Sequence, residues 1–152
     1  MAHFIRENGL RLRQKVRAVV ANTRGEVLLI RPHGYGEDEW TLPGGGVEAG
    51  ESPIEAMRRE LAEELGIACE QPEQLAVGNR FVYSAEYKRK RGLDHDGQQA
   101  VMFFVRVPDD CELHLQAEEV ADARWFEPNM AVAAFPAANQ RSVFQECMVL
   151  AA

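Results

Sequence analysis

The sequence lacks long apolar runs. Its 152 residues contain no stretch that approaches the roughly 20 apolar residues of a membrane span. Residues 1–13, MAHFIRENGLRLR, also lack the apolar core of a signal peptide. We therefore expect no membrane segment and a cytoplasmic location. The length is typical of one domain, so residues 1–152 are predicted to form a single domain.

Cysteine is scarce as well. The three cysteines, Cys69, Cys111 and Cys147, are odd in number and share no metal-type spacing. A disulfide framework needs paired cysteines, and a structural zinc site needs closely spaced ligands. We therefore predict neither kind of site and interpret the three thiols as buried or inert.

Positive charge is in the minority, with 17 lysines and arginines against 24 aspartates and glutamates. The formal charge is −7 at pH 7, whereas proteins that wrap a nucleic acid need clustered cations to release the counterions of its phosphates. A nucleic-acid duplex is therefore not an expected partner. One exception is the run KRKR at 88–91, which is predicted to lie on a loop. That run is either simply solvated or a contact to phosphate or to an acidic substrate.

Apolar runs separated by turn residues predict several strands. Residues 16–21 and 27–30 flank a Thr-Arg-Gly turn and predict a hairpin, and Asn8-Gly9 predicts an earlier tight turn after a short N-terminal strand. Further strands are predicted at 40–42, 74–84, 99–107 and 124–126, with a charged loop at 85–98.

The clearest helix is predicted at 53–65. Ser52 is a good N-cap and completes a capping box with Glu55, a proline occupies the first helical position, and Gly66 is a natural stop. Apolar residues at mostly helical spacing predict another helix at 138–150. This succession of elements predicts an α/β fold in which a mixed β-sheet packs between helices.

Three carboxylates share one face of the first helix. At about 100° per residue, Glu60, Glu63 and Glu64 lie close together beside the apolar stripe. They repel one another, so a cation that neutralises them would relieve that cost. Carboxylate oxygens suit Mg²⁺ or Mn²⁺. The alternative is a solvated acidic surface.

Two neighbouring features favour the metal interpretation. The consecutive glycines 44–46 let the backbone approach a ligand closely. Arg59 is spaced to reach back to Glu51 at the turn into the helix, either to hold this loop against the helix or as an ordinary ion pair.

These residues resemble the Nudix box, G-x5-E-x7-R-E-U-x-E-E-x-G-U, in which U is a bulky aliphatic residue. Every defined position is matched, by Gly45, Glu51, Arg59, Glu60, Leu61, Glu63, Glu64, Gly66 and Ile67. The chain is therefore identified as similar to the Nudix hydrolase superfamily, and in particular to its MutT-like members.

The resemblance implies a Nudix-type α/β/α sandwich and a Mg²⁺-dependent hydrolase, with Mn²⁺ as a possible substitute. Such an enzyme cleaves the pyrophosphate bond of a nucleoside diphosphate linked to another moiety, through attack by a metal-activated water. The implied metal ligands are Glu60, Glu63, Glu64 and the carbonyl of Gly44. The implied catalytic set is Glu51, Arg59, Glu60 and Glu64, of which the first two orient the loop.

By the same resemblance, the general base is either Glu60 or a glutamate of a later loop. Glu118 and Glu119 precede the strand predicted at 124–126 and are the later-loop candidates. The rival interpretation of this pair is an acidic turn.

Candidate substrate contacts outside the box are Arg31, Tyr83, Glu119 and Asn139. Arg31 lies where MutT-like relatives place a phosphate-contacting arginine, and Asn139 resembles the asparagine with which they read a purine. Tyr83 stands 16 residues beyond the box, where dinucleoside polyphosphate hydrolases carry a tyrosine. A surface cation, a helix cap and ordinary strand alternation are the respective rival interpretations.

The expected partner is a small-molecule nucleotide, and a homodimer is compatible with the sequence. The substrate is a (d)NTP or a related nucleotide, or alternatively a dinucleoside polyphosphate. A Nudix domain that senses a nucleotide without cutting it is a further alternative. Such sensors typically lose box glutamates, and this chain retains all of them.

Overall fold

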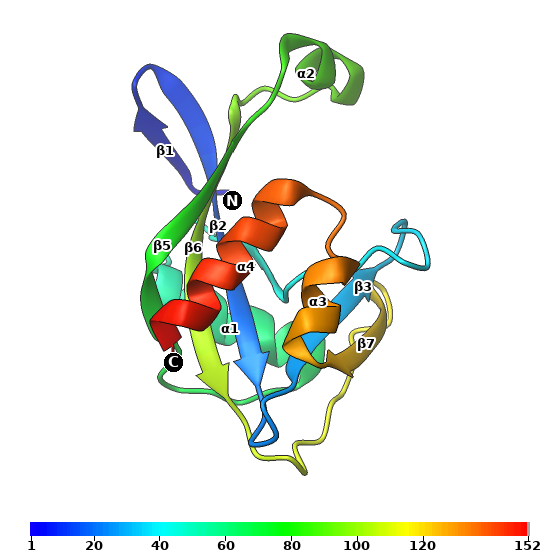
Figure 1. The fold of residues 1–152 in the computed structure, drawn as a ribbon. Coiled ribbons are helices and arrows are strands. Elements are labelled where there is room, and N and C mark those ends of the chain that lie inside the picture. The colour runs from blue at the N-terminus through cyan, green and yellow to red at the C-terminus, as the bar shows by residue number, and fades with distance from the viewer. Residues whose placement is uncertain (152) are drawn as a thin grey trace.

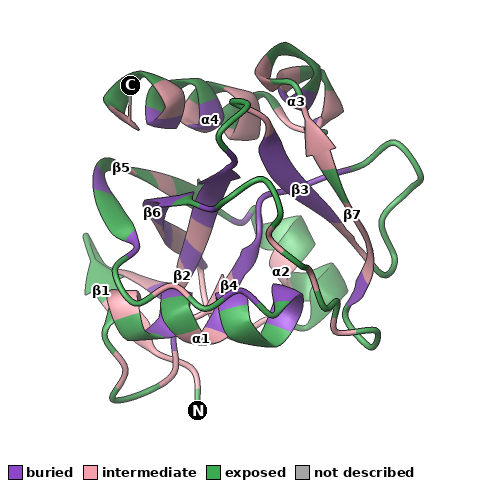
Figure 2. Cartoon of the chain, turned by 90° about the horizontal axis from the view of Figure 1, so that it is seen from below, coloured by how far each residue is buried: buried purple, intermediate pink, exposed green. Residues whose placement is uncertain are grey.

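The structure, a computed structural model, describes residues 1–151. The chain folds into three layers, in which helices cover both faces of a seven-stranded sheet. Figure 2 shows α1 on one side of the buried sheet and α3 and α4 on the other. The strands are β1 (Phe4–Glu7), β2 (Leu10–Ala21), β3 (Val27–Pro32), β4 (Gly44–Gly46), β5 (Glu73–Val82), β6 (Gly97–Arg106) and β7 (Val120–Phe126). The helices are α1 (Pro53–Leu65), α2 (Ala85–Arg91), α3 (Pro128–Ala134) and α4 (Ala138–Ala151). The predicted α/β sandwich is confirmed.

Strand β2 organises the sheet. The strand order is β5-β6-β2-β3-β7, and β1 and β4 also pair with β2. β2 and β6 run parallel along residues 12–21 of β2, whereas the other pairings are antiparallel, so the sheet is mixed as predicted. Side chains on β2 can therefore reach features brought in by four other strands (Figure 1).

Both predicted hairpins are present. Asn8 and Gly9 have φ angles of 52° and 79°, and positive φ at both central residues is what a tight two-residue hairpin turn requires. The second hairpin joins β2 to β3 but pairs them only at Ala21 and Val27, next to the turn. Beyond that point the two strands diverge.

Residues 40–46 lie between the diverging strands β2 and β3, and their structure differs from the prediction. Thr41 makes only an isolated bridge to Ile30, so the strand predicted at 40–42 is wrong. The strand in this region is β4, whose three glycines pair with residues 15–17 of β2. A β-carbon on Gly44 would overlap the carbonyl oxygen of Val16, so only glycine fits at position 44.

Alternation along β2 supplies apolar residues to both layers. Val16 and Val20 pack in one buried cluster with Leu61 of α1, and Val19 packs in another with Phe144 of α4. Fully burying a side chain of this size contributes roughly 1.5–3 kcal/mol. The two clusters fix both helices against the sheet and set the position of α1 relative to β2.

The segment predicted as a charged loop at 85–98 is also corrected. Its first half is helix α2, which Ser84 caps by accepting a hydrogen bond from the Tyr87 N–H, and which ends at Gly92 with φ 63°. The basic run 88–91 forms the last turn of this helix, where cations interact favourably with the helix dipole. Lys88 contacts Asp96 at 2.6 Å.

Helix α3 was not predicted. Helix α1 has its predicted bounds, and α4 extends one residue beyond the predicted end at residue 150.

Cys147 is buried and Cys69 and Cys111 are partly buried, and all three are free thiols. Across residues 1–151, no helix is both long and apolar enough to cross a membrane.

Candidate active site

The phase of α1 is fixed by local contacts at both ends. The Ser52 hydroxyl accepts from the Glu55 N–H at 3.2 Å, and the Glu55 carboxylate accepts from the Ser52 N–H at 3.0 Å. At the other end Gly66 is left-handed, and its N–H donates to carbonyls of the last turn. With Leu61 and Leu65 buried against the sheet, the helix has one rotational setting, which turns Glu60 and Glu64 toward β4.

These two glutamates are buried against the glycines of β4. Glu64 is 6% exposed, and its carboxylate accepts a hydrogen bond of 2.9 Å from the Gly44 N–H. Glu60 is 9% exposed, and its carboxylate occupies the space that a β-carbon on Gly45 would need. The glycines, which were expected to let the backbone approach a ligand, form a strand whose backbone packs directly against these two carboxylates.

Arg59 connects the helix to the loop that precedes it. Its guanidinium donates two hydrogen bonds to Glu51, at 2.7 and 3.0 Å, and one of 2.9 Å to the Gly46 carbonyl. It also contacts Glu60 at 3.0 Å and Glu63 at 3.3 Å. The expected contact between Arg59 and Glu51 is thus present, in a two-pronged geometry that fixes direction as well as distance.

Burial sets the charge of this cluster. It raises the pKa of Glu64 to about 7, and repulsion from Glu60 adds to the effect. Burial also raises the pKa of Glu60, despite the neighbouring Arg59. Hydrogen bonds from Arg59 instead hold the pKa of Glu51 below its usual range. The helix therefore carries two buried carboxylates that lack sufficient positive charge around them.

A divalent cation fits this deficit. The donors are carboxylate and backbone oxygens, which Mg²⁺ prefers. Glu63 is half exposed and contacts Arg59, and within residues 1–151 no three acidic, histidine or cysteine side chains already converge into a metal cage. Binding would therefore require Glu63 to turn from Arg59 toward Glu60 and Glu64.

Lys15 and Arg17 of β2 lie close to the carboxylates Glu60 and Glu64, and the sequence analysis did not identify them as site residues. Arg11, Arg13, Lys15 and Arg17 alternate along the strand and therefore share one face of the sheet. Burial lowers the pKa of Lys15 to about 8, with further lowering by Arg17 and Arg13 and opposition from Glu60 and Glu64. Period-two cations within an otherwise apolar strand were the available signal.

Two of these cations, Lys15 and Arg17, line a pocket that is here called the inner pocket. It has a volume of about 390 Å³, and Lys15, Arg17, Asn79, Phe81 and Asn139 are among the residues that line it. The Asn139 amide donates to the Asn79 side-chain oxygen at 3.4 Å across the pocket. Asn139 was a predicted substrate contact, whereas Asn79 was not considered.

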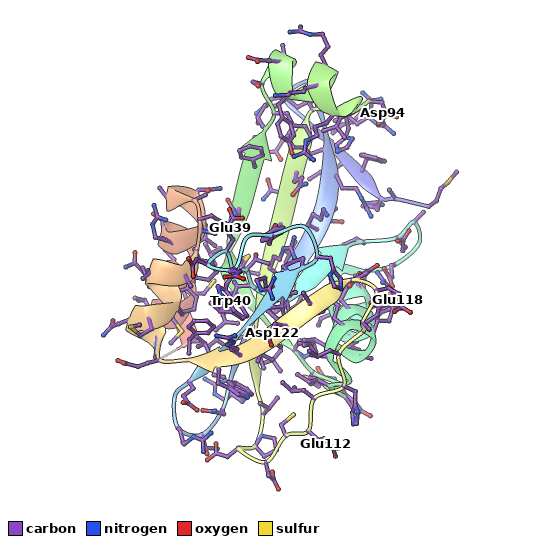
Figure 3. All side chains as sticks on the ribbon, turned by 90° about the vertical axis from the view of Figure 1, so that its right-hand side faces the viewer. Glu39, Trp40, Asp94, Glu112, Glu118 and Asp122 are labelled. Atoms are coloured by element: carbon purple, nitrogen blue, oxygen red, sulfur yellow. The ribbon has the colours of Figure 1, made fainter. Side chains whose placement is uncertain are left out.

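The other predicted contacts are dispersed. Arg31 lies on β3 with its guanidinium 6.0 Å from the Trp40 ring centroid, and it is not among the residues that line the inner pocket. Tyr83 is 8% exposed and its ring packs against the rings of Tyr87 and His95, and it is not among the residues that line the inner pocket. Glu119 lies in an exposed turn, and its negative charge contributes to the raised pKa of Glu60 and Glu64. Figure 3 shows the neighbouring Glu118 beside α1.

Comparison with known proteins assigns the family. The model of the NUDIX domain matches residues 11–147, which is most of the chain. The chain belongs to the Nudix family. Its Nudix box is the segment from Gly45 to Ile67 described above, and its fold agrees with the sandwich that the box implied.

Several curated proteins are similar to the chain in sequence. It is 38% identical over 115 residues to an RNA pyrophosphohydrolase of Halorhodospira halophila, a match that covers 72% of this chain and 60% of that relative. It is 31% identical to an RNA pyrophosphohydrolase of Aeromonas hydrophila, over 91% of this chain and 85% of the other. The chain spans 60–63% of the first four curated relatives that it matches.

The solved structures agree on the fold. The MutT protein from Methanosarcina mazei superimposes with a TM-score of 0.69 at 26% identity, over 88% of this chain and 90% of that protein.

Proposed function

We propose that this Nudix chain is a Mg²⁺-dependent pyrophosphohydrolase that cleaves an anhydride bond in a nucleoside diphosphate linked to another group. The observation that carries the proposal is the pair of buried carboxylates, Glu60 and Glu64, packed against β4 and close to the cations Lys15 and Arg17. A surface that binds both a cation and a polyphosphate needs these two kinds of charge side by side.

Glu60, Glu63, Glu64 and the carbonyl of Gly44 are the groups that would hold Mg²⁺, or Mn²⁺ in its place. When bound, the ion neutralises charge on the phosphates and lowers the pKa of a bound water. Arg59 and Glu51 act as positioning residues, because their mutual hydrogen bonds tie the start of the helix to the end of β4.

Glu60 is the proposed general base that takes the proton of the attacking water. Its pKa is raised by burial, which brings a carboxylate closer to the pH at which it can accept a proton effectively. Glu119 is the rival base, since its charge is felt by both glutamates. Because Glu60 is also a proposed metal ligand, Glu119→Gln is the variant that decides. If Glu60 is the base, Glu119→Gln should retain most of the turnover; loss of turnover in Glu119→Gln with unchanged Mn²⁺ binding would assign the role to Glu119.

Lys15 and Arg17 would stabilise the negative charge of the phosphates, because both line the inner pocket next to the carboxylates. The nucleoside would occupy the inner pocket. There, Phe81 is 47% exposed and offers a stacking surface, and Asn79 and Asn139 present amide donors and acceptors.

The names of the relatives at 31–38% identity favour a nucleotide with a 5′-polyphosphate, including the 5′ end of an RNA, as the first substrate class to test. The net charge of −7 is compatible with a single phosphorylated end, which does not require a long basic surface.

The test is product analysis by mass spectrometry. The full chain is incubated with and without Mg²⁺ with dNTPs, oxidised dNTPs, dinucleoside polyphosphates, nucleotide sugars and 5′-triphosphorylated or capped RNA, and Glu64→Gln serves as the matched control. Metal-dependent cleavage of one class, lost in the variant, is the expected result. Binding without turnover of any class would instead indicate a nucleotide sensor.

A further inference from the structure

The turn from β4 into α1 is held by two sets of contacts. Residues 46–51, here called the box loop, form this turn together with the last glycine of β4. One set comes from α1, where Arg59 donates to the Gly46 carbonyl and to Glu51. The other set comes from residues 1–3, here called the N-terminal arm, and Figure 2 shows the N-terminus on the α1 side of the sheet. These contacts of the arm reach the box loop without passing through the helix.

The arm, β2 and the box loop meet in a closed ring of three backbone hydrogen bonds. The Gln14 N–H donates to the His3 carbonyl at 3.0 Å, and the His3 N–H donates to the Val47 carbonyl at 2.9 Å. The Val47 N–H closes the ring by donating to the Gln14 carbonyl at 3.0 Å. Beyond the ring, the arm continues along the box loop, where the Ala49 N–H donates to the Met1 carbonyl at 2.7 Å. Each of the three ring residues is therefore fixed by the other two.

One side chain, that of Arg13, contacts all three carbonyls of the ring. Its Nη1 donates to the Val47 carbonyl at 2.5 Å and lies 3.5 Å from the carbonyl oxygens of both His3 and Gln14. The negative ends of three carbonyl dipoles thus converge on one nitrogen, and a charged donor strengthens such hydrogen bonds. No carboxylate within residues 1–151 is within ion-pair distance of Arg13. The charge of Arg13 is therefore directed at these carbonyls.

The Arg13 guanidinium also packs against the end of β4. A β-carbon on Gly46 would overlap this guanidinium, so the glycine is what allows the side chain to lie so close. Gly46 consequently contacts two guanidinium groups, that of Arg13 at its α-carbon and that of Arg59 at its carbonyl. Unlike Lys15 and Arg17, Arg13 is not among the residues that line the inner pocket. Its contacts therefore hold the box loop and do not reach a nucleotide in that pocket.

The path from the ring to the carboxylates is short. Val47 directly follows β4, a strand of only three residues, so the hydrogen bonds of Val47 hold much of that strand in place. The first residue of the strand, Gly44, donates its N–H to Glu64, and the next, Gly45, leaves the space that the Glu60 carboxylate occupies. A displaced box loop would therefore change the backbone against which both carboxylates are set.

We propose that Arg13 and the N-terminal arm are positioning elements of the metal site, because Arg13 joins the carbonyls of the arm, β2 and the box loop and so fixes the strand against which Glu60 and Glu64 pack. The inference rests on the proposed function and deepens it. Arg13 acts through Val47 and contacts neither the metal nor the substrate. Its loss should therefore impair metal binding and turnover together and leave KM nearly unchanged.

The side chain is tested on the full chain with Arg13→Ala, and Arg11→Ala is the matched control. Arg11 lies on the same face of β2 but contacts Asp94 and not the box loop. Mn²⁺ titration followed by electron paramagnetic resonance, and kcat and KM at saturating Mg²⁺, are measured for each variant. Arg13→Ala should bind Mn²⁺ about tenfold more weakly and lower kcat about tenfold, with KM changed less than about twofold. Arg13→Lys restores a charged donor and should recover most of both losses, and Arg11→Ala should show neither.

The arm is tested through its backbone. His3→Pro removes the N–H that donates to Val47, whereas His3→Ala keeps it. His3→Pro should weaken Mn²⁺ binding about threefold, as expected for the loss of one hydrogen bond, and His3→Ala should bind as the wild type does. Hydrogen-exchange mass spectrometry should show faster exchange at residues 44–51 in Arg13→Ala and His3→Pro, and not in the two controls. Thermal melting reports the folding of each variant, and the His3 pair decides if Arg13→Ala does not fold.

Two results would overturn the inference. A raised KM in Arg13→Ala with unchanged Mn²⁺ affinity would make Arg13 a substrate contact. Wild-type Mn²⁺ affinity in both Arg13→Ala and His3→Pro would leave Arg13 and the arm with a purely structural role. Failure of the hydrolase proposal has a different signature, since the wild type would then cleave no substrate while the variants would still differ in Mn²⁺ affinity and in hydrogen exchange.

Discussion

Two sets of charged side chains flank the proposed cleavage position, and they are held in different ways. The carboxylates lie within one continuous segment, where the caps of α1, the Arg59 contacts and the glycines of β4 position them. The cations lie on β2, and the strands that form their pocket come from distant parts of the sequence. The carboxylate set is therefore specified locally, and the cation set by topology.

This difference separates two functions. The carboxylate set would perform chemistry common to many substrates, because its members all lie within the box. The cation set and the inner pocket would choose the substrate, because they are assembled from β2, β5, β6 and α4. Changes in the first set should affect turnover of every substrate, and changes in the second should affect substrates unequally.

The largest expected effect is that of Glu64→Gln. Removal of a buried charge at the proposed metal site should lower kcat on the order of a thousandfold for every substrate cleaved. Rate measurements on two substrate classes check this, with circular dichroism as the control for folding. Loss on one class alone would contradict the separation of chemistry from selection.

Alanine substitutions at two glycines of β4 should have opposite effects on stability and activity. Gly45→Ala displaces only the flexible end of Glu60, so stability should change by less than about 1 kcal/mol while activity falls roughly a hundredfold through misplacement of that carboxylate. Gly44→Ala would overlap the β2 backbone at a φ of 154° and should destabilise the fold by about 2–4 kcal/mol. Chemical denaturation and rates distinguish the two; equal behaviour would mean that β4 is not held this closely.

The raised pKa of Glu64, about 7 against an ordinary 4.5, predicts a pH-dependent stability of the metal-free protein. The folded state holds this proton more tightly than the unfolded state, so the free energy of unfolding should fall as pH rises from about 4.5 to 7. The total change is on the order of 3 kcal/mol. Urea denaturation in EDTA at pH 5 and pH 8 measures it. Glu64→Gln should remove most of the difference, and an unaltered difference in that variant would assign the effect elsewhere.

The smallest expected effect on activity is that of changing Lys15, which belongs to the cation set on β2. Its pKa of about 8 means that it loses its charge as pH rises above that value, so kcat/KM should decline on the alkaline side. Lys15→Arg keeps the charge and should abolish that decline, whereas Lys15→Met should lower kcat/KM about tenfold at pH 7. Rate profiles from pH 6 to about 9.5 test this. Identical alkaline declines in the wild type and in Lys15→Arg would exclude Lys15 as their source.

The sequence predicted α1 to the residue because its signals are local. Ser52 and Glu55 cap the start, Gly66 ends the helix, and the Leu61 stripe buries one face. The Asn8-Gly9 turn was equally readable, since both residues tolerate positive φ. Local signals also existed for α2, namely Ser84 as N-cap and Gly92 as stop, but the charge of the segment favoured a loop.

The remaining features depend on partners distant in sequence. Three consecutive glycines have low strand propensity, and β4 is a strand only because β2 lies beside it. Helix α3 has a proline in its first turn, Pro128, but it lacks a side-chain N-cap and is only seven residues long, so the sequence did not predict it. The pocket joins Asn79 of β5 to Asn139 of α4, and no spacing within the chain predicts that contact.

The central claim is that the carboxylates of α1 hold a divalent cation at a position fixed by β4. Its most direct test is Mn²⁺ titration of the full chain, followed by electron paramagnetic resonance, on the wild type and on Glu64→Gln. The wild type is expected to bind Mn²⁺ saturably, and the variant is expected to bind it at least tenfold more weakly. Equal Mn²⁺ affinity in the two proteins would contradict it.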